Sequence, residues 1–222
     1  MLLYYYITDR AHFSGTESQR QDRLLKKISE AANAGVEYIQ LREKDLSGRA
    51  LESLAQEVAK LINESSSCTR LLINSRTDVA LAAKAHGIHL TSNDISPADA
   101  KKIWREAQSP VDPIIAVSCH TETEVLAAER GPDRVAAGVH ARPAADFVVF
   151  GPVFEKQGAK KAAGLDELRK ACQHRIPVLA LGGVTTENAH LCLEAGASGI
   201  AGIRLFQENN IAEVVKNLRG LK

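Results

Sequence analysis

Short apolar runs alternate with amphipathic segments along the chain, and no linker or low-complexity stretch interrupts them. The apolar runs have the length of buried strands, and the segments between them carry apolar residues at helical spacing. The expected strands cover residues 2–7, 36–41, 71–74, 87–90, 114–118, 147–150, 178–181 and 199–203. Parallel strands need long crossover connections, which helices usually supply. The alternation therefore predicts a single domain over residues 1–222, an α/β fold closed into a parallel (β/α)8 TIM barrel.

An open, doubly wound sheet is the alternative architecture. It would need fewer strands or a GxGxxG turn after the first strand, and the sequence has neither. The expected helices cover residues 20–34, 51–62, 77–85, 125–129, 165–172, 187–195 and 211–218, with one more opened by Pro97. A capping box is expected at Thr121, and residues 131–143 are expected to form a long loop.

Composition excludes several classes of protein. A net charge of +1 gives no general attraction to nucleic acid or to a membrane. No apolar run reaches the length of a membrane span, and the first residues lack the features of a signal peptide. The four cysteines show no CxxC spacing, so we expect reduced thiols and a cytoplasmic location. The sequence does not fix the oligomeric state, and a homo-oligomer stays open.

The stretch from residue 178 to residue 206 predicts a phosphate site. One expected strand ends at Gly182 and Gly183, and the next ends at Gly202, Ile203 and Arg204. Neighbouring parallel strands that end in this way direct backbone N–H groups into one volume, which suits an anion. In (β/α)8 barrels a phosphate commonly sits after the last two strands. For Gly183 alone a tight turn is the simpler interpretation, but for the two strand ends together we favour the phosphate.

A cationic group follows the second expected strand. Gln40, Arg42 and Lys44 alternate along the chain, so they should point in one direction. The outer face of a barrel is covered by helices, where two cations would be costly to bury. At the mouth they would instead form a wall that hydrogen-bonds a phosphate or a carboxylate.

Candidate binding residues follow other expected strands, namely Asn74, Asp94, Ser118 and Gly151. His120 can titrate near neutral pH and transfer a proton, although capping or solvation explains this histidine equally well. His89 lies inside an expected strand, where a hydrogen-bonded packing role is favoured. The loop over residues 151–164 contains glycines and lysines and is long enough for a lid.

Several segments together resemble the thiamin phosphate synthase/TenI family. They are YYITDR (5–10), YIQLREKDL (38–46), LLINSRTDVALAAKAHGIHL (71–90), VSCHTETEVLAAE (117–129), ADFVVFGPVF (145–154) and PVLALGGVTTENAHLCLEAGASGIAG (177–202). The resemblance implies a (β/α)8 barrel that works in thiamin biosynthesis. It also implies a thiazole phosphate bound at Gly182, Gly183, Ile203 and Arg204.

The synthase branch of this family joins hydroxymethylpyrimidine diphosphate to thiazole phosphate and uses Mg²⁺. The resemblance implies that the polar set on the diphosphate is kept at Gln40, Arg42, Lys44, Asn74, Asp94 and Ser118, with Asp94 as the metal ligand. Ser75 stands where the family usually has a second aspartate, which should weaken Mg²⁺ binding. The family's Pro-Thr-x-Thr-Lys loop is replaced by residues 155–160, where Lys156 or Lys160 is left to supply the charge. Arg204 replaces the usual serine.

These departures favour, narrowly, the other branch, whose members resemble the thiazole tautomerase TenI. That reaction removes one proton from a carboxythiazole phosphate and adds another, with no cofactor, and His120 matches the position credited with it. The aligned histidine also occurs in synthases, and the retained Asp94 favours a synthase. A barrel that only binds thiazole or thiamin phosphate as a regulator is a third interpretation, but it leaves Gln40, Arg42 and Lys44 without a task.

Overall fold

The computed structural model describes residues 2–65, 67–130, 144–155 and 162–221. Within these residues the strands form a closed barrel in which each strand pairs in parallel with the next, and β8 pairs with β1. The (β/α)8 prediction is confirmed. The strands are β1 (Leu3–Ile7), β2 (Tyr38–Leu41), β3 (Arg70–Asn74), β4 (Gly87–Leu90), β5 (Ile114–Cys119), β6 (Phe147–Phe150), β7 (Val178–Ala180) and β8 (Gly199–Gly202).

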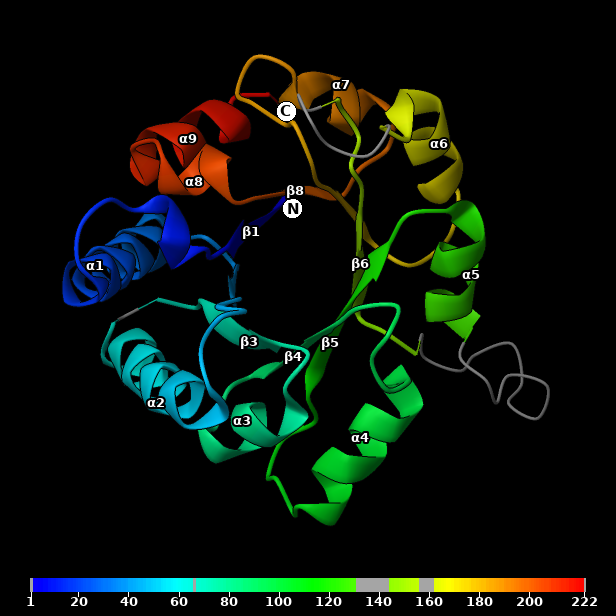
Figure 1. The fold of residues 1–222 in the computed structure, drawn as a ribbon. Coiled ribbons are helices and arrows are strands. Elements are labelled where there is room, and N and C mark those ends of the chain that lie inside the picture. Colours follow the sequence, from blue (N-terminus) through cyan, green and yellow to red (C-terminus); the bar gives the residue numbers. More distant parts are fainter. Residues whose placement is uncertain (1, 66, 131–143, 156–161, 222) are drawn as a thin grey trace.

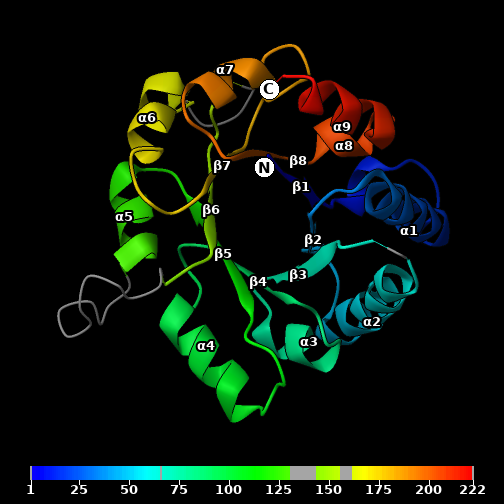
Figure 2. The ribbon, with the colours of Figure 1, turned by 180° about the vertical axis from the view of Figure 1, so that it is seen from behind.

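The helices form a ring outside the barrel, as Figures 1 and 2 show from opposite sides. They are α1 (Glu17–Ala34), α2 (Gly48–Glu64), α3 (Thr77–Ala82), α4 (Pro97–Glu106), α5 (Glu122–Arg130), α6 (Gly164–Ala171), α7 (Ala189–Glu194), α8 (Arg204–Gln207) and α9 (Ile211–Arg219). A short 3₁₀ helix, η1 (Arg10–His12), follows β1. Among the described residues, every helix is too short or too polar to cross a bilayer.

Local capping contacts fix where the helices begin. Thr16 and Gln19 form a capping box at the start of α1, and Gly35 ends this helix in the left-handed region with φ 78°. The capping box predicted at Thr121 is confirmed, because the N–H of Glu124 donates to the Thr121 hydroxyl and the N–H of Thr121 donates to the Glu124 carboxylate. Each N-cap side chain accepts from a first-turn N–H that has no partner within the helix, so the helix begins at that residue.

Several element boundaries differ from the sequence prediction by two or three residues, and one helix was not predicted. α7 begins later than residue 187, because Thr185 and Asn188 hydrogen-bond each other in a turn that precedes this helix. The four residues of α8 follow β8 directly, and their short length gives no helical period to detect in the sequence. β2 begins two residues later than expected, at Tyr38. The loop predicted over residues 131–143 lies outside the described residues.

Side chains fill the barrel interior. The inner cluster includes Tyr5, Leu72, Phe147, Leu179 and Ala201. The rings of Tyr5 and Phe147 meet edge to face, with centroids 5.5 Å apart. A second, larger cluster lies between the strands and the helices. Because the interior is a packed core, a ligand can reach the strand residues only at the open mouth.

Candidate active site

The ends of β2, β3 and β4 are joined by a chain of side-chain hydrogen bonds. Gln40 Nε2 donates to Asn74 Oδ1 at 2.7 Å, and Asn74 Nδ2 donates to Ser75 Oγ at 3.0 Å. Ser75 Oγ then lies 2.8 Å from Asp94 Oδ2. Four residues singled out in the sequence therefore meet at the mouth of the barrel, although the chain separates Gln40 from Asp94 by two strands.

The direction of this chain is set at Asp94. An ionised carboxylate only accepts hydrogen bonds, so the Ser75 hydroxyl donates to it. Ser75 Oγ then accepts from the Asn74 amide nitrogen, and the Asn74 oxygen faces the amide nitrogen of Gln40. Gln40 Oε1 is consequently buried with no hydrogen-bond partner among the described residues. A buried acceptor without a donor costs about 1–3 kcal/mol, so a ligand that supplies a donor here would gain affinity.

A second polar chain runs inside the barrel beneath Ser118. His89 is 2% exposed, and its Nδ1 lies 3.0 Å from the Tyr5 hydroxyl while its Nε2 lies 2.7 Å from Ser118 Oγ. Burial lowers the pKa of His89 to about 3, so the imidazole is neutral near pH 7. The packing role predicted for His89 is confirmed, and this histidine also holds the Ser118 hydroxyl at the mouth.

His120 and Gly151 meet at the ends of β5 and β6. The Nδ1 atom of His120 lies 2.5 Å from the Gly151 carbonyl oxygen, and Gly151 N donates to the carbonyl of Cys119 at 3.1 Å. A carbonyl only accepts, so Nδ1 carries a proton, and the neutral form of this ring would have its lone pair on Nε2. The exposed His120 side chain is thus oriented by Gly151, while Thr121 caps α5.

The glycine-ended strands β7 and β8 are neighbours. Gly182 and Gly183 have φ values of 97° and 68°, in the left-handed region that favours glycine. A Cβ on Gly182 would lie 2.6 Å from Pro152, and one on Gly183 would lie 2.7 Å from Phe154. Among the described residues no protein acceptor is found for either N–H group. The positive φ values confirm the tight turn, and within the described part of the chain its two N–H groups remain available as donors.

β8 ends beside this turn. Gly202 is its last residue, Ile203 follows as the N-cap of α8, and Arg204 begins that helix with an exposed side chain. The structure therefore brings the two predicted strand ends to the same face of the barrel. The candidate phosphate residues follow these two neighbouring strand ends, and their role in binding phosphate stays a prediction.

The alternation expected for Gln40, Arg42 and Lys44 does not extend beyond Gln40, because β2 ends before Arg42. Gln40 points into the barrel and is 1% exposed. Arg42 is held by its main chain, whose N–H donates to Thr8 Oγ1 at 3.0 Å, and its guanidinium lies 3.7 Å from Asp9 Oδ2. Lys44 is exposed. Loop contacts, and not the strand pleat, thus place these two cations at the rim.

Asp94 is the candidate metal ligand. Its Oδ2 accepts from the N–H and the hydroxyl of Thr91 at 2.6 and 2.8 Å, and also from Ser75. Among the described residues, no three histidine, cysteine or acidic side chains converge to hold a metal ion. Mg²⁺ is often held by one or two carboxylates together with substrate phosphates and water. Asp94 fits that kind of site through Oδ1, whereas the residues do not fit a cage made by protein ligands alone.

Comparison with known proteins identifies the family. The family model described as thiamine monophosphate synthase matches residues 4–206. The chain belongs to the thiamine monophosphate synthase family. The resemblance found in the sequence is thereby confirmed, and with it the expectation of an enzyme.

Relatives within the thiamine monophosphate synthase family match almost the whole chain. A protein of Aquifex aeolicus named putative thiamine-phosphate synthase 2 is 35% identical, over 92% of this chain and 97% of its own length. A thiamine-phosphate synthase of Coprothermobacter proteolyticus is 32% identical, over 98% of this chain and 93% of its own. The solved structure of a thiamine phosphate pyrophosphorylase from Pyrococcus furiosus superposes with a TM-score of 0.77 at 28% identity, covering 99% of this chain and 95% of that one.

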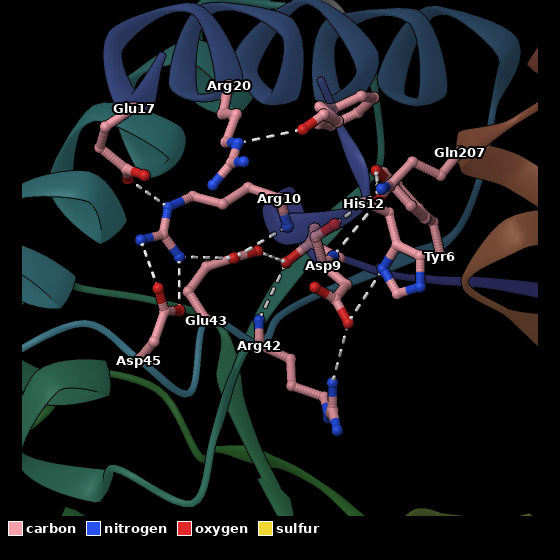
Figure 3. Close-up of polar contacts among 12 residues, drawn as sticks. Tyr6, Asp9, Arg10, His12, Glu17, Arg20, Arg42, Glu43, Asp45 and Gln207 are labelled. Carbon is pink, nitrogen blue, oxygen red and sulfur yellow. Dashed lines mark hydrogen bonds and ion pairs between the residues drawn. The ribbon is translucent and has the colours of Figure 1, made fainter. Parts of the chain in front are cut away.

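Two supporting groups of this family member were not predicted from the sequence. One is the link from Tyr5 through His89 to Ser118. The other joins Arg10 to Glu43, beside Arg42, as Figure 3 shows. The sequence did give a sign of the second group, because an acidic residue, Glu43, lies between the two cations of the expected site. Lys156 and Lys160 lie outside the described residues, so the lid stays a prediction.

Proposed function

We propose that the chain is a thiamine-phosphate synthase, which joins hydroxymethylpyrimidine diphosphate to thiazole phosphate. It would act in the cytoplasm on these small substrates, without a nucleic-acid or membrane partner. The sequence alone narrowly favours a tautomerase. The names of relatives that match nearly the full length support the synthase instead.

The buried oxygen of Gln40 carries this proposal. Its amide nitrogen is committed to Asn74, so the oxygen requires a donor from a ligand. The pyrimidine half of thiamine carries an exocyclic amino group, which is such a donor. The carboxythiazole phosphate used by a tautomerase has no N–H group. A pyrimidine held at Gln40 therefore satisfies an atom that the tautomerase substrate would leave unpaired.

The charged groups of the substrates match the two sides of the mouth. Arg42, Lys44 and Asn74 would bind the diphosphate beside Gln40, and Asp94 would hold Mg²⁺, which neutralises part of the diphosphate charge. The phosphate of the thiazole would sit on the main-chain N–H groups at the ends of β7 and β8, which supplied the prediction of an anion site. The residues at these two strand ends are Gly182, Gly183, Ile203 and Arg204.

The reaction then follows from positioning. The thiazole ring nitrogen attacks the methylene carbon of the pyrimidine, a C–N bond forms, and the C–O bond to the diphosphate breaks with its electron pair leaving on oxygen. Arg42 and Lys44 stabilise the negative charge that develops on the leaving group. Gln40 and Ser118 orient the pyrimidine, which lowers the entropic cost of bringing two substrates together.

One observation supports a tautomerase as second candidate. The contact between His120 and Gly151 fixes the ring so that Nε2 is the basic atom, which is the state that a proton-transfer base requires. Gly151 lies next to the β7 turn, so a thiazole bound at that turn would lie at the same mouth of the barrel as His120. Ser75 stands where the family usually has a second carboxylate, and the loss of that metal ligand does not affect a reaction that needs no metal.

The test supplies purified protein with hydroxymethylpyrimidine diphosphate, thiazole phosphate and Mg²⁺ and measures thiamine phosphate. We expect turnover that is lost in Asp94→Ala and retained in His120→Asn, which keeps a donor to Gly151 but has no base. If no thiamine phosphate forms, while carboxythiazole phosphate isomerises in the parent and not in His120→Asn, the chain is a tautomerase. Binding of thiazole phosphate without either reaction would identify a regulator.

A further inference from the structure

We propose that Glu43 and Arg10 are positioning residues, which hold the loop after β2 so that Arg42 and Lys44 meet the diphosphate. Arg10 also neutralises the Glu43 carboxylate, which would otherwise repel that diphosphate. This inference rests on the proposed function, because the diphosphate belongs to the synthase reaction. Neither residue touches the substrates in this proposal, so both act through the loop.

Glu43 lies between the two cations in the sequence, yet its side chain is only 1% exposed. Its Oε1 accepts from the Thr8 hydroxyl at 2.5 Å. Its Oε2 accepts from the main-chain N–H of Arg10 at 3.0 Å and from Arg10 Nη1 at 3.1 Å. In Figure 3 the Arg42 side chain extends away from this group, toward Asp9. Each carboxylate oxygen of Glu43 therefore has a donor from the loop after β1.

Thr8 connects the buried carboxylate to Arg42. Its hydroxyl donates to Glu43 and accepts from the N–H of Arg42 at 3.0 Å. A hydroxyl has one proton, so the acceptor at Glu43 fixes the orientation that lets Thr8 accept from Arg42. Removing the carboxylate would free the hydroxyl to rotate, and the main chain of Arg42 would lose its fixed partner.

Arg10 ties the far end of the same loop. Its guanidinium forks onto both oxygens of Asp45 at 2.7 and 2.8 Å, and its Nε donates to Glu17 on α1 at 2.5 Å. The contacts to Arg42, Glu43 and Asp45 hold the segment 42–45 at a main-chain N–H and at two carboxylates. Planar two-point contacts between arginine and a carboxylate restrict geometry more than a single contact does. The loop is therefore fixed on both sides of Lys44, whose own side chain is exposed.

The placement of charge at the buried Arg10–Glu43 pair supports the same role. Burying an ion pair costs desolvation energy, and apolar residues of similar size would pack the site at least as favourably. The pair is better explained by where it places charge. If the Glu43 carboxylate turned toward the mouth, it would offset the charge of Arg42 or Lys44. Paired with Arg10 at 4% exposure, it leaves both cations to act on an anion. Among the described residues, the Arg42 guanidinium has one ion-pair contact, 3.7 Å from Asp9, and keeps donors for a ligand.

The test measures binding of inorganic pyrophosphate with Mg²⁺ by calorimetry, and KM for each substrate. Glu43→Gln should weaken pyrophosphate binding and raise KM for the pyrimidine diphosphate, each about tenfold, because a charge-assisted contact is replaced by one in which an N–H group opposes a donor. KM for thiazole phosphate should stay at the parent value. The matched control is Glu17→Gln, which likewise removes a negative charge beside Arg10 but lies on α1, outside the loop after β2. It should bind pyrophosphate like the parent.

A second variant, Asp45→Asn, serves if Glu43→Gln does not fold, because Asp45 is 65% exposed in its side chain. It should show the same selective rise in KM, to a smaller degree. Folded variants that bind pyrophosphate like the parent, or that change both KM values equally, would overturn the inference. A parent that binds pyrophosphate but forms no thiamine phosphate would refute the proposed function and leave the positioning result standing.

Discussion

Gln40 and Asn74 face each other across β2 and β3, with the amide nitrogen of Gln40 2.7 Å from the amide oxygen of Asn74. The contact belongs to a hydrogen-bond chain whose direction is set by Asp94, two strands away from Gln40. Its consequence is a buried Gln40 oxygen that has no donor among the described residues. The Asp94 carboxylate thus determines that the Gln40 side chain presents its oxygen as an acceptor on the other side of the mouth.

The first prediction concerns Gln40→Met, which keeps the volume of the side chain but removes the acceptor. KM for the pyrimidine diphosphate should rise about 10- to 100-fold, matching about 1–3 kcal/mol for an unmet buried polar group. KM for thiazole phosphate should change little. Steady-state kinetics with each substrate varied in turn measures the difference. The control is Gln56→Met on the exposed face of α2. Equal effects on the two KM values would contradict a pyrimidine at Gln40.

The second prediction is that Ser75→Asp strengthens Mg²⁺ binding. Ser75 has φ 61°, a left-handed conformation that aspartate tolerates better than most residues. The new carboxylate would stand beside Asp94, and the two would repel each other until a cation binds. Thermal unfolding with pyrophosphate should therefore shift more with added Mg²⁺ than it does for the parent. Ser75→Ala controls for the lost hydroxyl, and an unchanged Mg²⁺ response in Ser75→Asp would remove Asp94 from the metal site.

Local pattern was sufficient to predict the barrel and the strand ends. Each strand and helix has its own apolar period, and glycines mark the turns at Gly182 and Gly183, so neighbours in sequence carried that information. The predicted alternation of Arg42 with Gln40 failed because it assumed a strand that continues. β2 in fact stops at Leu41, and contacts with Thr8 take over.

The supporting contacts depend on residues far apart in the chain. Thr8 meets Glu43 across a separation of 35 residues, and His89 meets Ser118 across 29. No local period relates such pairs, and only the strand register brings them together. This is why the sequence pointed to the residues that line the mouth, but not to the buried groups that orient them.

The third prediction concerns Gly183→Ala. Gly183 combines a left-handed φ of 68° with a neighbour, Phe154, that would lie 2.7 Å from the new Cβ. Either the turn or Phe154 must move, so the N–H groups of the turn lose their alignment and KM for thiazole phosphate should rise about tenfold. The control is Gly164→Ala, where φ is 85° but no atom of the described part of the chain lies within 4 Å of the Cβ. It should cost about 1 kcal/mol of stability through backbone strain and leave KM unchanged.

Both glycine variants are compared by denaturant unfolding and by kinetics. Strain alone would lower the free energy of unfolding in both and alter KM in neither. A rise in KM confined to Gly183→Ala is the outcome that links the turn to phosphate. If Gly183→Ala folds and binds thiazole phosphate as the parent does, the turn at the end of β7 does not hold the phosphate.

The last prediction concerns pH and His89. Its pKa falls from the ordinary 6.5 to about 3 because the native fold buries the imidazole. Between these values the unfolded chain binds a proton that the native protein does not, so the free energy of unfolding should fall as pH drops below 6.5. At pH 5 the loss should be about 2 kcal/mol, from 1.36 kcal/mol per unit over about 1.5 units.

Urea unfolding at pH 7 and pH 5 measures this loss. His89→Gln lacks the titrating ring, so the difference in stability between the two pH values should shrink by about 2 kcal/mol. The variant should also be less stable at pH 7, because Tyr5 and Ser118 lose their common partner. The control is His190→Gln, on an exposed face of α7, which should keep the pH dependence of the parent. A parent-like pH dependence in His89→Gln would mean that acid destabilises the barrel through other groups and that His89 does not resist protonation.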